Sequence, residues 1–385
     1  MRKLRMGLVG GGPGSFIGRI HRIAAELDGE AELVCGAFSS DAQRSREAGA
    51  AYHVDPARAY ASYAQMFAAE KALPADKRMD FIAVVTPNHV HYEPARLALE
   101  NGFHVVVDKP LCFSLAEARE LQAAVERSGG VLAVTYTYSG YPLIKQARAL
   151  VNAGRIGAVR KIYVEYPQGW LATDIEGSGQ KQASWRTDPT KSGAGGAIGD
   201  IGTHAAHLAE YVSGLRITQI DAMLNTFIPG RRLDDDASML LRFDNGASGV
   251  LVATQIAAGE ENNLALRIYG ESGSIEWRHA DPNSLVLRSL DAPVQILRTG
   301  AAYLGEAAAR NTRTPPGHPE GYLEAFANIY TAFYRGVRAH ADGAKVEPRA
   351  YDFPGIADGV RGMAFIDAVI RSAQSQQKWT EFGNP

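Results

Sequence analysis

The stretch from Leu4 to His21 reads LRMGLVGGGPGSFIGRIH and combines a short apolar strand pattern, a glycine cluster and the start of a helix. Glycines between a strand and a helix let the backbone approach a pyrophosphate, whose charge is favoured at a helix N-terminus. Five residues separate Gly12 from Gly18, more than in the G-x-G-x-x-G pattern. We expect a lengthened dinucleotide-binding turn; a glycine-rich turn without a ligand is the alternative. The candidate contacts are Gly10, Gly12, Gly14, Ser15, Phe16 and Ile17.

Outward from this turn, short apolar runs alternate with helical patterns, which is typical of a parallel, doubly wound sheet. Later in the chain, strand patterns flank the turns at 244–246 and 270–273, which predicts hairpins and an antiparallel sheet. The fold class is therefore α/β, with an N-terminal Rossmann sheet followed by an α+β domain that has a large, open, mainly antiparallel sheet. We place a cofactor domain at 1–137, and a domain for substrate binding and oligomerisation at 138–385.

Composition excludes several classes of function. The 385 residues include 40 Lys and Arg against 42 Asp and Glu, and this balance offers no basic surplus for nucleic acid. Two cysteines, Cys35 and Cys112, cannot form a disulfide framework. We find neither a signal-peptide pattern nor a stretch of about 18 apolar residues. We expect a cytoplasmic protein without nucleic-acid or membrane partners.

The end of the second predicted strand bears on which cofactor binds. Rossmann strands at this position usually end with an acid that binds the ribose hydroxyls of NAD. Here the strand ends at Ser39 and Ser40, followed by Asp41 and Arg44. The two hydroxyls and the arginine could hold the 2′-phosphate of NADP, whereas Asp41 could recover the acid's role for NAD. The cofactor is therefore NAD or NADP.

Two further motifs are more specific than the glycines. The first is Thr86-Pro87-Asn88-His89-Val90-His91, followed by a helix pattern and a strand that ends at Asp108-Lys109-Pro110. The second is Gly199-Asp200-Ile201-Gly202-Thr203-His204. In this order they resemble the T-P-N-x-x-H, E-K-P and G-D-x-G-x-H motifs of the Gfo/Idh/MocA oxidoreductase family. The chain departs from the family pattern at Asp108, which keeps the charge of the glutamate on a shorter side chain.

The resemblance implies that Lys109, Asp200 and His204 form the catalytic set. Oxidation of an alcohol needs a base for the hydroxyl proton and positive charge near the developing oxyanion. Asp200 and His204 are four residues apart and would share a helix face, where the carboxylate favours a protonated imidazole. We leave open which of Lys109 and His204 takes the proton, with preference for His204. A surface lysine and a helix-capping aspartate are the structural alternatives.

Other residues are weaker candidates. The resemblance implies cofactor contacts for Thr86, Asn88, His91, Asp108, Lys109, Trp185 and Arg186. Lys109, Asp200 and His204 are also substrate candidates, together with Tyr138 at the domain junction and His318 near the start of a helix. No set of ligands has the spacing of a zinc site, so we expect no metal. Asp234-Asp235-Asp236, just before a hairpin strand, is interpreted as a solvated turn.

These features lead to a hypothesis about function. By resemblance, the chain is an NAD(P)-dependent dehydrogenase acting on a secondary hydroxyl of a sugar, sugar derivative or cyclic polyol. One alternative is a glycosidase that uses bound NAD to oxidise, eliminate, rehydrate and reduce. Another is a dinucleotide-binding sensor without catalysis. Because an open sheet leaves one face uncovered, we expect a homodimer or homotetramer that pairs this face.

Overall fold

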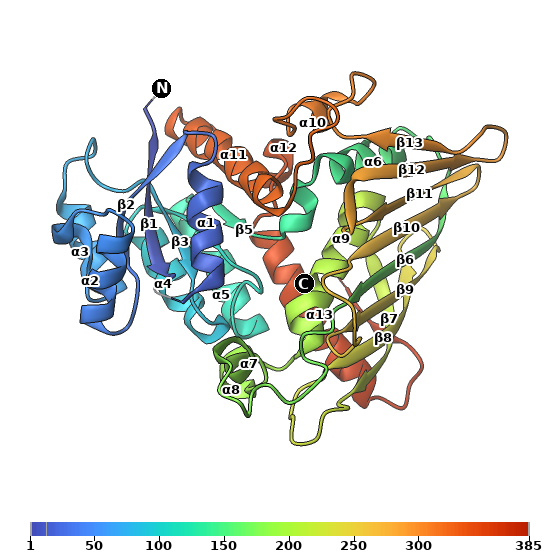
Figure 1. Ribbon diagram of the computed structural model, residues 1–385, viewed down its shortest axis with the longest axis horizontal. Helices are drawn as coiled ribbons and strands as arrows, with labels where there is room; N and C mark the ends of the chain where they lie inside the picture. Colours follow the sequence, from blue (N-terminus) through green and yellow to red (C-terminus); the bar gives the residue numbers. More distant parts are fainter. Residues whose placement is uncertain (1, 13, 384–385) are drawn as a thin grey trace. The chain divides into compact units, whose positions relative to one another are not determined.

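The computed structural model describes residues 2–12 and 14–383, and the chain divides into two compact units (Figure 1). The first unit contains Met1–Thr137 and Phe326–Val360, and the second contains Tyr138–Ala325 and Arg361–Pro385. The first division thus falls between Thr137 and Tyr138. Residues 326–360 group with the first unit, whereas the sequence analysis assigns the whole chain after Thr137 to the second domain.

The first unit is built on a parallel five-stranded sheet in the order β2-β1-β3-β4-β5. This sheet is the doubly wound arrangement expected from the sequence. Its strands are β1 (Leu4–Gly10), β2 (Ala31–Ala37), β3 (Phe81–Val85), β4 (His104–Val107) and β5 (Leu132–Val134). The helices between them are α1 (Phe16–Glu26), α2 (Ala42–Ala51), α3 (Tyr63–Ala72), α4 (Tyr92–Glu100) and α5 (Leu115–Ser128). The strand β3 is buried along its whole length, which explains why its sequence is continuously apolar.

Aromatic packing explains why residues 326–360 group with the first unit. The helices of this region are α11 (Tyr322–Ala341), α12 (Pro348–Tyr351) and α13 (Ile356–Gln374), of which α11 and α13 extend into the second unit. On α11, the rings of Phe333 and Tyr334 lie 5.3 and 5.7 Å from the ring of Phe81 on β3. The backbone of β5 also pairs with Pro354, through a 2.8 Å bond from Val134 N–H. These contacts bury large apolar rings against the parallel sheet.

The second unit is built on a nine-stranded sheet in the order β13-β12-β11-β10-β6-β9-β8-β7-β14. Its strands are β6 (Val159–Pro167), β7 (Ile217–Asn225), β8 (Asp236–Phe243), β9 (Ser248–Thr254), β10 (Ala265–Gly270), β11 (Gly273–Arg278), β12 (Asp281–Ser289), β13 (Gln295–Arg298) and β14 (Thr380–Glu381). The pairs are antiparallel except β6 with β9, which is parallel. The helices α6 (Pro142–Asn152) and α9 (Thr203–Ser213) contact the sheet, and burial alternates along β8 and β9. Shorter helices are α7 (Lys181–Arg186), α8 (Pro189–Ser192) and α10 (Glu306–Ala309).

The predicted hairpin between β8 and β9 is present, but its turn differs from the symmetric two-residue turn that Asn-Gly favours. Gly246 has a φ of 86°, and Gly246 N–H donates to Phe243 C=O at 2.9 Å. The side chain of Asn245 donates to Val159 C=O at 2.9 Å and accepts from Ala247 N–H at 2.9 Å. These side-chain bonds hold Asn245 in an ordinary conformation, and only the glycine takes positive φ.

Candidate active site

The glycine turn after β1 is shaped by close backbone contacts. Gly10 and Gly11 have φ values of 87° and 77°, which favour glycine. A Cβ at Gly12 would lie 2.7 Å from Phe38 C=O, and one at Gly18 would lie 2.3 Å from the Cα of Gly11. Ser15 caps α1 by accepting from Gly18 N–H at 3.2 Å. The backbone between β1 and α1 thus follows a path that side chains would block.

This turn opens at the point where the strand order reverses. From β1 the chain passes to β2 on one side and later to β3 on the other, and ligands of doubly wound sheets bind at such a switch point. Thr86 directly follows β3, and its methyl group lies 2.9 Å from where a Cβ of Gly10 would be. The Thr86 hydroxyl is buried and has no hydrogen-bond partner among the described residues. The turn therefore combines a glycine-lined backbone path with an unsatisfied hydroxyl, which fits a bound dinucleotide.

The residues expected to decide between NAD and NADP lie at the end of β2. Ser39 Oγ accepts from Asp41 N–H at 3.2 Å, and Asp41 caps α2 by accepting from Arg44 N–H at 2.8 Å. Ser40 and Arg44 are exposed. Nearby, Phe16 begins α1 with 63% of its surface exposed, although it is a large apolar side chain. All of these residues lie around the carboxyl ends of β1 and β2.

His91, a predicted cofactor contact, lies between two turns of the first unit. Its ring nitrogens lie 2.9 Å from Pro110 C=O and 2.7 Å from Thr86 C=O, and the residue is 1% exposed. Burial lowers the pKa of His91. The side chain connects the turn after β3 to the turn after β4, and both of its ring nitrogens face backbone carbonyls. Asn88, in the same motif, is also buried.

Asp108 and Lys109 follow β4, and Asp108 is surrounded by polar partners. Its Oδ1 lies 3.6 Å from His21 Nε2 and accepts from the Thr135 hydroxyl at 2.7 Å. Burial alone would raise the pKa of Asp108, but His21, Lys109 and Thr135 together hold it well below its usual range. His21 is fully buried on α1, and its Nδ1 is 2.7 Å from the hydroxyl of Tyr330 on α11. The shorter acid is therefore held as a carboxylate directly before Lys109, which is partly exposed.

In the second unit, Asp200 and His204 lie on one continuous helical run, which sequence reasoning expected to be an ordinary helix. Residues Ile198–Gly202 instead form a π turn that leads into α9. π turns are rare in proteins, and those that occur often lie at functional sites. Thr203, the first residue of α9, donates its hydroxyl to Gly199 C=O at 3.0 Å. The wider turn carries Asp200, and the α-helix that follows carries His204.

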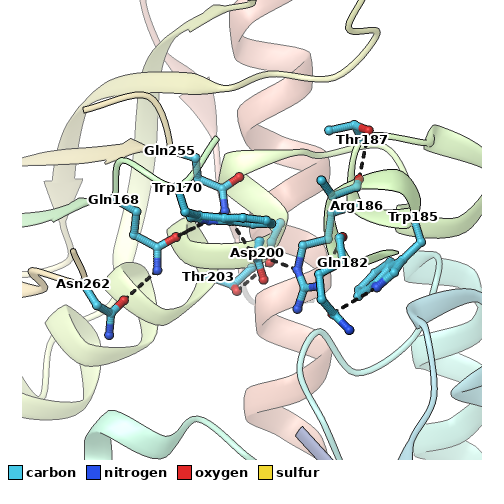
Figure 2. A network of polar contacts seen from close by, with 12 residues as sticks. Gln168, Trp170, Gln182, Trp185, Arg186, Thr187, Asp200, Thr203, Gln255 and Asn262 are labelled. Atoms are coloured by element: carbon cyan, nitrogen blue, oxygen red, sulfur yellow. Dashed lines mark hydrogen bonds and ion pairs between the residues drawn. The ribbon is translucent and has the colours of Figure 1, made fainter. Parts of the chain in front are cut away.

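Asp200 is held by two side chains (Figure 2). Its Oδ2 accepts from Gln255 Nε2 at 2.8 Å and lies 3.3 Å from Arg186 Nε. The Arg186 guanidinium packs on the ring of Trp185 at 4.3 Å and lies 5.9 Å from that of Trp170. Gln182 accepts from Trp185 Nε1 at 3.3 Å. Trp185 and Arg186, which are predicted cofactor contacts, thus lie in α7, and Arg186 brings positive charge to Asp200.

Amide side chains extend this site away from Asp200. Gln255 also donates to Gln168 Oε1 at 3.3 Å, and Gln168 donates to Asn262 Oδ1 at 2.6 Å (Figure 2). Trp170 Nε1 donates to Gln168 Oε1 at 3.0 Å. In this group of described side chains the two charges, on Asp200 and Arg186, are paired with each other. The remaining polar groups are neutral donors and acceptors.

Tyr138, a predicted substrate residue, packs directly against His204. The two rings meet edge to face at 4.9 Å, and the residues are 4% and 7% exposed. The Tyr138 hydroxyl accepts from Asn262 Nδ2 at 3.1 Å and is hydrogen-bonded to the Tyr166 hydroxyl. Burial raises the pKa of both tyrosines, which therefore stay protonated at neutral pH. The Asn262 side chain and the His204 ring thus both contact Tyr138, which is hydrogen-bonded to Tyr166.

Two other expectations concern His318 and metals. His318 lies in an exposed turn, where its carbonyl accepts from the Thr314 hydroxyl at 2.9 Å. Within residues 2–12 and 14–383, no group of three or more His, Cys, Asp or Glu side chains is arranged to hold a metal ion. No described helix is long and apolar enough to cross a membrane.

Sequence reasoning missed the amides Gln168, Gln255 and Asn262. Gln168 directly follows β6 and Gln255 directly follows β9, and these strands are parallel neighbours with Pro167 opposite Thr254. The carboxyl ends of parallel strands meet at one edge of a sheet, so the two glutamines are brought together. The sequence signal was the polar residue that follows each of the two strands. It could be interpreted only with the knowledge that β6 and β9 are parallel neighbours. An expectation of hairpins alone does not provide that pairing.

Comparisons with known proteins agree with the geometry. Residues 4–136 match the family described as oxidoreductase family, NAD-binding Rossmann fold. Residues 144–276 match the GFO/IDH/MocA C-terminal domain. Among curated proteins, an uncharacterized oxidoreductase of Bacillus subtilis (strain 168), YfiI, is 36% identical over 99% of this chain and 97% of its own length.

Two further relatives have names that state a substrate or a ligand. Levoglucosan dehydrogenase of Pseudarthrobacter phenanthrenivorans is 27% identical, over 99% of this chain and 98% of its own. The crystal structure of an inositol dehydrogenase homolog from Azotobacter vinelandii, complexed with NADH and myo-inositol, superposes with a TM-score of 0.92 at 35% identity. That match covers 99% of this chain and 98% of the other.

Proposed function

This chain belongs to the Gfo/Idh/MocA family of oxidoreductases, and from that premise we propose that it is an NAD-dependent dehydrogenase of a neutral cyclic polyol or sugar. The reaction converts a secondary hydroxyl to a ketone, or the reverse. The observation that carries the proposal is the network of amides and tyrosines joined to Asp200 and His204. The catalytic residues we propose are Lys109, Asp200 and His204.

The first unit supports the cofactor part of this proposal. The glycine path at 10–12, the first turn of α1 and the Thr86 hydroxyl form a cradle that a dinucleotide fits. NAD held there supplies a hydride acceptor. We propose NAD rather than NADP because Asp41 offers a carboxylate near the end of β2 and because the inositol dehydrogenase homolog was crystallised with NADH. Ser39, Ser40 and Arg44 would then border the adenosine ribose.

The second unit supports the substrate part. Sugars and polyols present several hydroxyls, each a donor and an acceptor, and amide side chains offer both in fixed directions. Gln168, Gln255 and Asn262 supply these groups, and the Arg186 charge is already paired with Asp200. A phosphate or carboxylate on the substrate would lack an unpaired cation in this network. A neutral polyol therefore fits better than a charged sugar.

We propose a separate role in the reaction for each of the catalytic side chains. We propose that His204 takes the hydroxyl proton during oxidation. Its ring is buried beside protonated tyrosines, so the imidazolium that forms needs a negative charge nearby. Asp200 favours the imidazolium that results, and Arg186 and Gln255 hold the Asp200 carboxylate in one position. Lys109, following Asp108, supplies positive charge to the developing oxyanion.

The experiment that tests this function offers purified protein NAD and NADP separately against myo-inositol, other inositols, aldoses, levoglucosan and glucose 6-phosphate, with absorbance of reduced cofactor as the readout. We expect turnover with NAD and a neutral polyol or sugar, and loss of turnover in Lys109→Ala and His204→Ala. Cofactor binding without net turnover across the panel would contradict the dehydrogenase and favour a redox glycosidase or a sensor.

We also propose that the open face of the nine-stranded sheet pairs two copies of the chain. Leu240 on β8 and Tyr269 on β10 point away from the buried face and are 45% and 37% exposed, and Met223 on β7, opposite Ser238, is 56% exposed. Burying such a face would remove apolar surface from water. Light scattering at micromolar concentration should show at least a dimer, and Leu240→Arg should shift it toward the monomer. A monomeric wild-type protein would contradict the pairing.

A further inference from the structure

Asp234, which the sequence analysis interprets as part of a solvated turn, is instead bonded to the backbone ahead of Asp200. Its Oδ1 accepts from Gly196 N–H at 2.6 Å, its Oδ2 from Ile198 N–H at 2.8 Å, and its carbonyl from Ala197 N–H at 2.9 Å. One residue thus satisfies three consecutive amides at the start of the π turn. A helix start leaves such amides without intrahelical partners, so their direction depends on what accepts from them.

Close packing fixes this contact further. A Cβ at Gly196 would lie 2.1 Å from Asp234 C=O, so no larger residue permits the approach. The carbonyl of Gly196 in turn accepts from Asp200 N–H at 3.0 Å. The path from the Asp234 carboxylate to the backbone of Asp200 therefore consists of two consecutive hydrogen bonds within a single turn of chain.

The neighbouring Asp235 is bonded to the loop that follows β7. It is 2% exposed, and its carboxylate accepts from Phe227 N–H at 2.9 Å and Ile228 N–H at 3.0 Å. It also lies 3.3 Å from Arg231, whose guanidinium is bonded to Leu171 C=O at 2.8 Å. Arg231 further binds Glu176 at 2.7 Å, so it anchors the segment between β6 and α7.

The backbone of Asp235 is also bonded to Gln255, which directly follows β9 and contacts Asp200. Its carbonyl accepts from Gln255 N–H at 2.9 Å, and Gln255 C=O accepts from Leu171 N–H at 3.1 Å. The Gln255 side chain then donates to Asp200 at 2.8 Å. Two adjacent aspartates therefore support Asp200 from two directions, through its own backbone and through its side-chain partner.

We infer that Asp234 and Asp235 are positioning residues for Asp200, with Asp234 fixing the backbone of the π turn and Asp235 fixing Gln255 and the loop after β6. The carboxylate form of Asp234 matters because both oxygens accept. A carboxamide offers one acceptor and turns an NH₂ group toward the second amide. The kinetic part of this inference rests on the proposed dehydrogenase function, whereas the structural part stands on the contacts alone.

The test compares Asp234→Asn with Asp236→Asn in the full-length protein. Asp236 is the matched control, because it belongs to the same acidic run but its carboxylate accepts, among the described residues, only from Asn225 Nδ2, at 3.0 Å. Hydrogen exchange read by mass spectrometry reports the amides of 196–203 without needing activity. Steady-state kinetics with a polyol deuterated at the reacting carbon reports the chemical step.

In D234N we expect exchange of 196–203 to quicken by on the order of tenfold. We expect kcat to fall by about 10- to 100-fold, with a larger deuterium isotope effect and an unchanged KM for NAD. D236N should match the wild type in all of these. A merely structural role would lower kcat in proportion to the folded fraction and leave the isotope effect unchanged.

The positioning role is contradicted if exchange at 196–203 is the same in D234N and wild type, or if an active wild type and D234N have kcat values within about twofold. Wild-type protein without turnover on any polyol contradicts the proposed function instead, and the exchange result alone then decides the positioning role. Should D234N not fold, Asp234→Ser, which keeps one acceptor, replaces it in both measurements.

Discussion

Arg186 Nε lies 3.3 Å from Asp200 Oδ2, and this contact joins the end of α7 to the π turn ahead of α9. The guanidinium is packed against Trp185 and is only partly exposed, so solvent screens the pair less than it would a surface ion pair. This contact gives α7 a definite role, since it places a positive charge next to the Asp200 carboxylate, on the same helical run as His204.

Replacing Arg186 should therefore affect the chemical step. In Arg186→Gln we expect kcat/KM for the polyol to fall by about 10- to 100-fold, because the Asp200 carboxylate loses a charged partner. Arg186→Lys keeps the charge without the planar contact on Trp185 and should lose less. Steady-state kinetics checks this, with Arg232→Gln as an exposed control. Equal activity in R186Q and wild type would show that the ion pair has no catalytic effect.

Asn262 should determine how tightly the polyol binds. It accepts from Gln168 and Tyr166 and donates to Tyr138, so Asn262→Leu leaves buried partners unsatisfied. We expect the free energy of unfolding to fall by about 1–3 kcal/mol. The KM for the polyol should rise by about tenfold or more, while the KM for NAD stays within twofold. Chemical denaturation and kinetics measure these quantities. An unchanged polyol KM would remove Asn262 from the substrate site.

Arg44 distinguishes the two cofactors. If NAD is the cofactor, Arg44→Ala should change the KM for NAD by less than about twofold, because no charged group of NAD needs the arginine there. If the arginine instead binds a 2′-phosphate, the same substitution should raise the KM for NADP by tenfold or more. Kinetics with both cofactors decides, and a wild-type preference for NADP would contradict the NAD assignment.

The stability conferred by Asp108 should depend on pH in a defined direction. Because its pKa in the folded protein lies below the ordinary value of about 3.9, the carboxylate stabilises the fold above that pH. We expect Asp108→Asn to lower the free energy of unfolding by about 2 kcal/mol at pH 7. This difference should shrink as the pH falls below about 4, toward the lower folded pKa.

Denaturant titrations of D108N and wild type at several pH values measure this difference. Asp244→Asn, in the exposed β8–β9 turn, is the matched control and should change stability little at any pH. A difference between D108N and wild type that stays constant from pH 7 to pH 3 would show that the Asp108 charge does not stabilise the fold.

Much of the architecture could be predicted because it depends on local patterns. The buried run of β3, the glycines after β1 and the turn at Gly246 each specify their element through side-chain burial or backbone conformation. The family motifs likewise pointed to Asp200 and His204, whose catalytic roles stay predictions. These signals lie in neighbouring residues and need no knowledge of which distant segments meet.

Features that depend on long-range packing could not be predicted. The aromatic residues of α11 indicate a buried helix but not that Phe333 and Tyr334 pack on Phe81 of the first sheet. An acidic run normally indicates solvent, yet Asp235 is buried because Arg231 and two backbone amides satisfy it. The π turn at Asp200 also has no local signal, since it depends on what Asp234 accepts.

The most direct test of the central claim is the transfer of label from substrate to cofactor. Protein is incubated with NAD and myo-inositol deuterated on its ring carbons, and the reduced cofactor is analysed by mass spectrometry. We predict reduced NAD that carries deuterium, with no such product from Lys109→Ala or His204→Ala. Reduced cofactor without deuterium, or no reduced cofactor with any neutral polyol or sugar so labelled, would contradict a dehydrogenase that takes hydride from a polyol carbon.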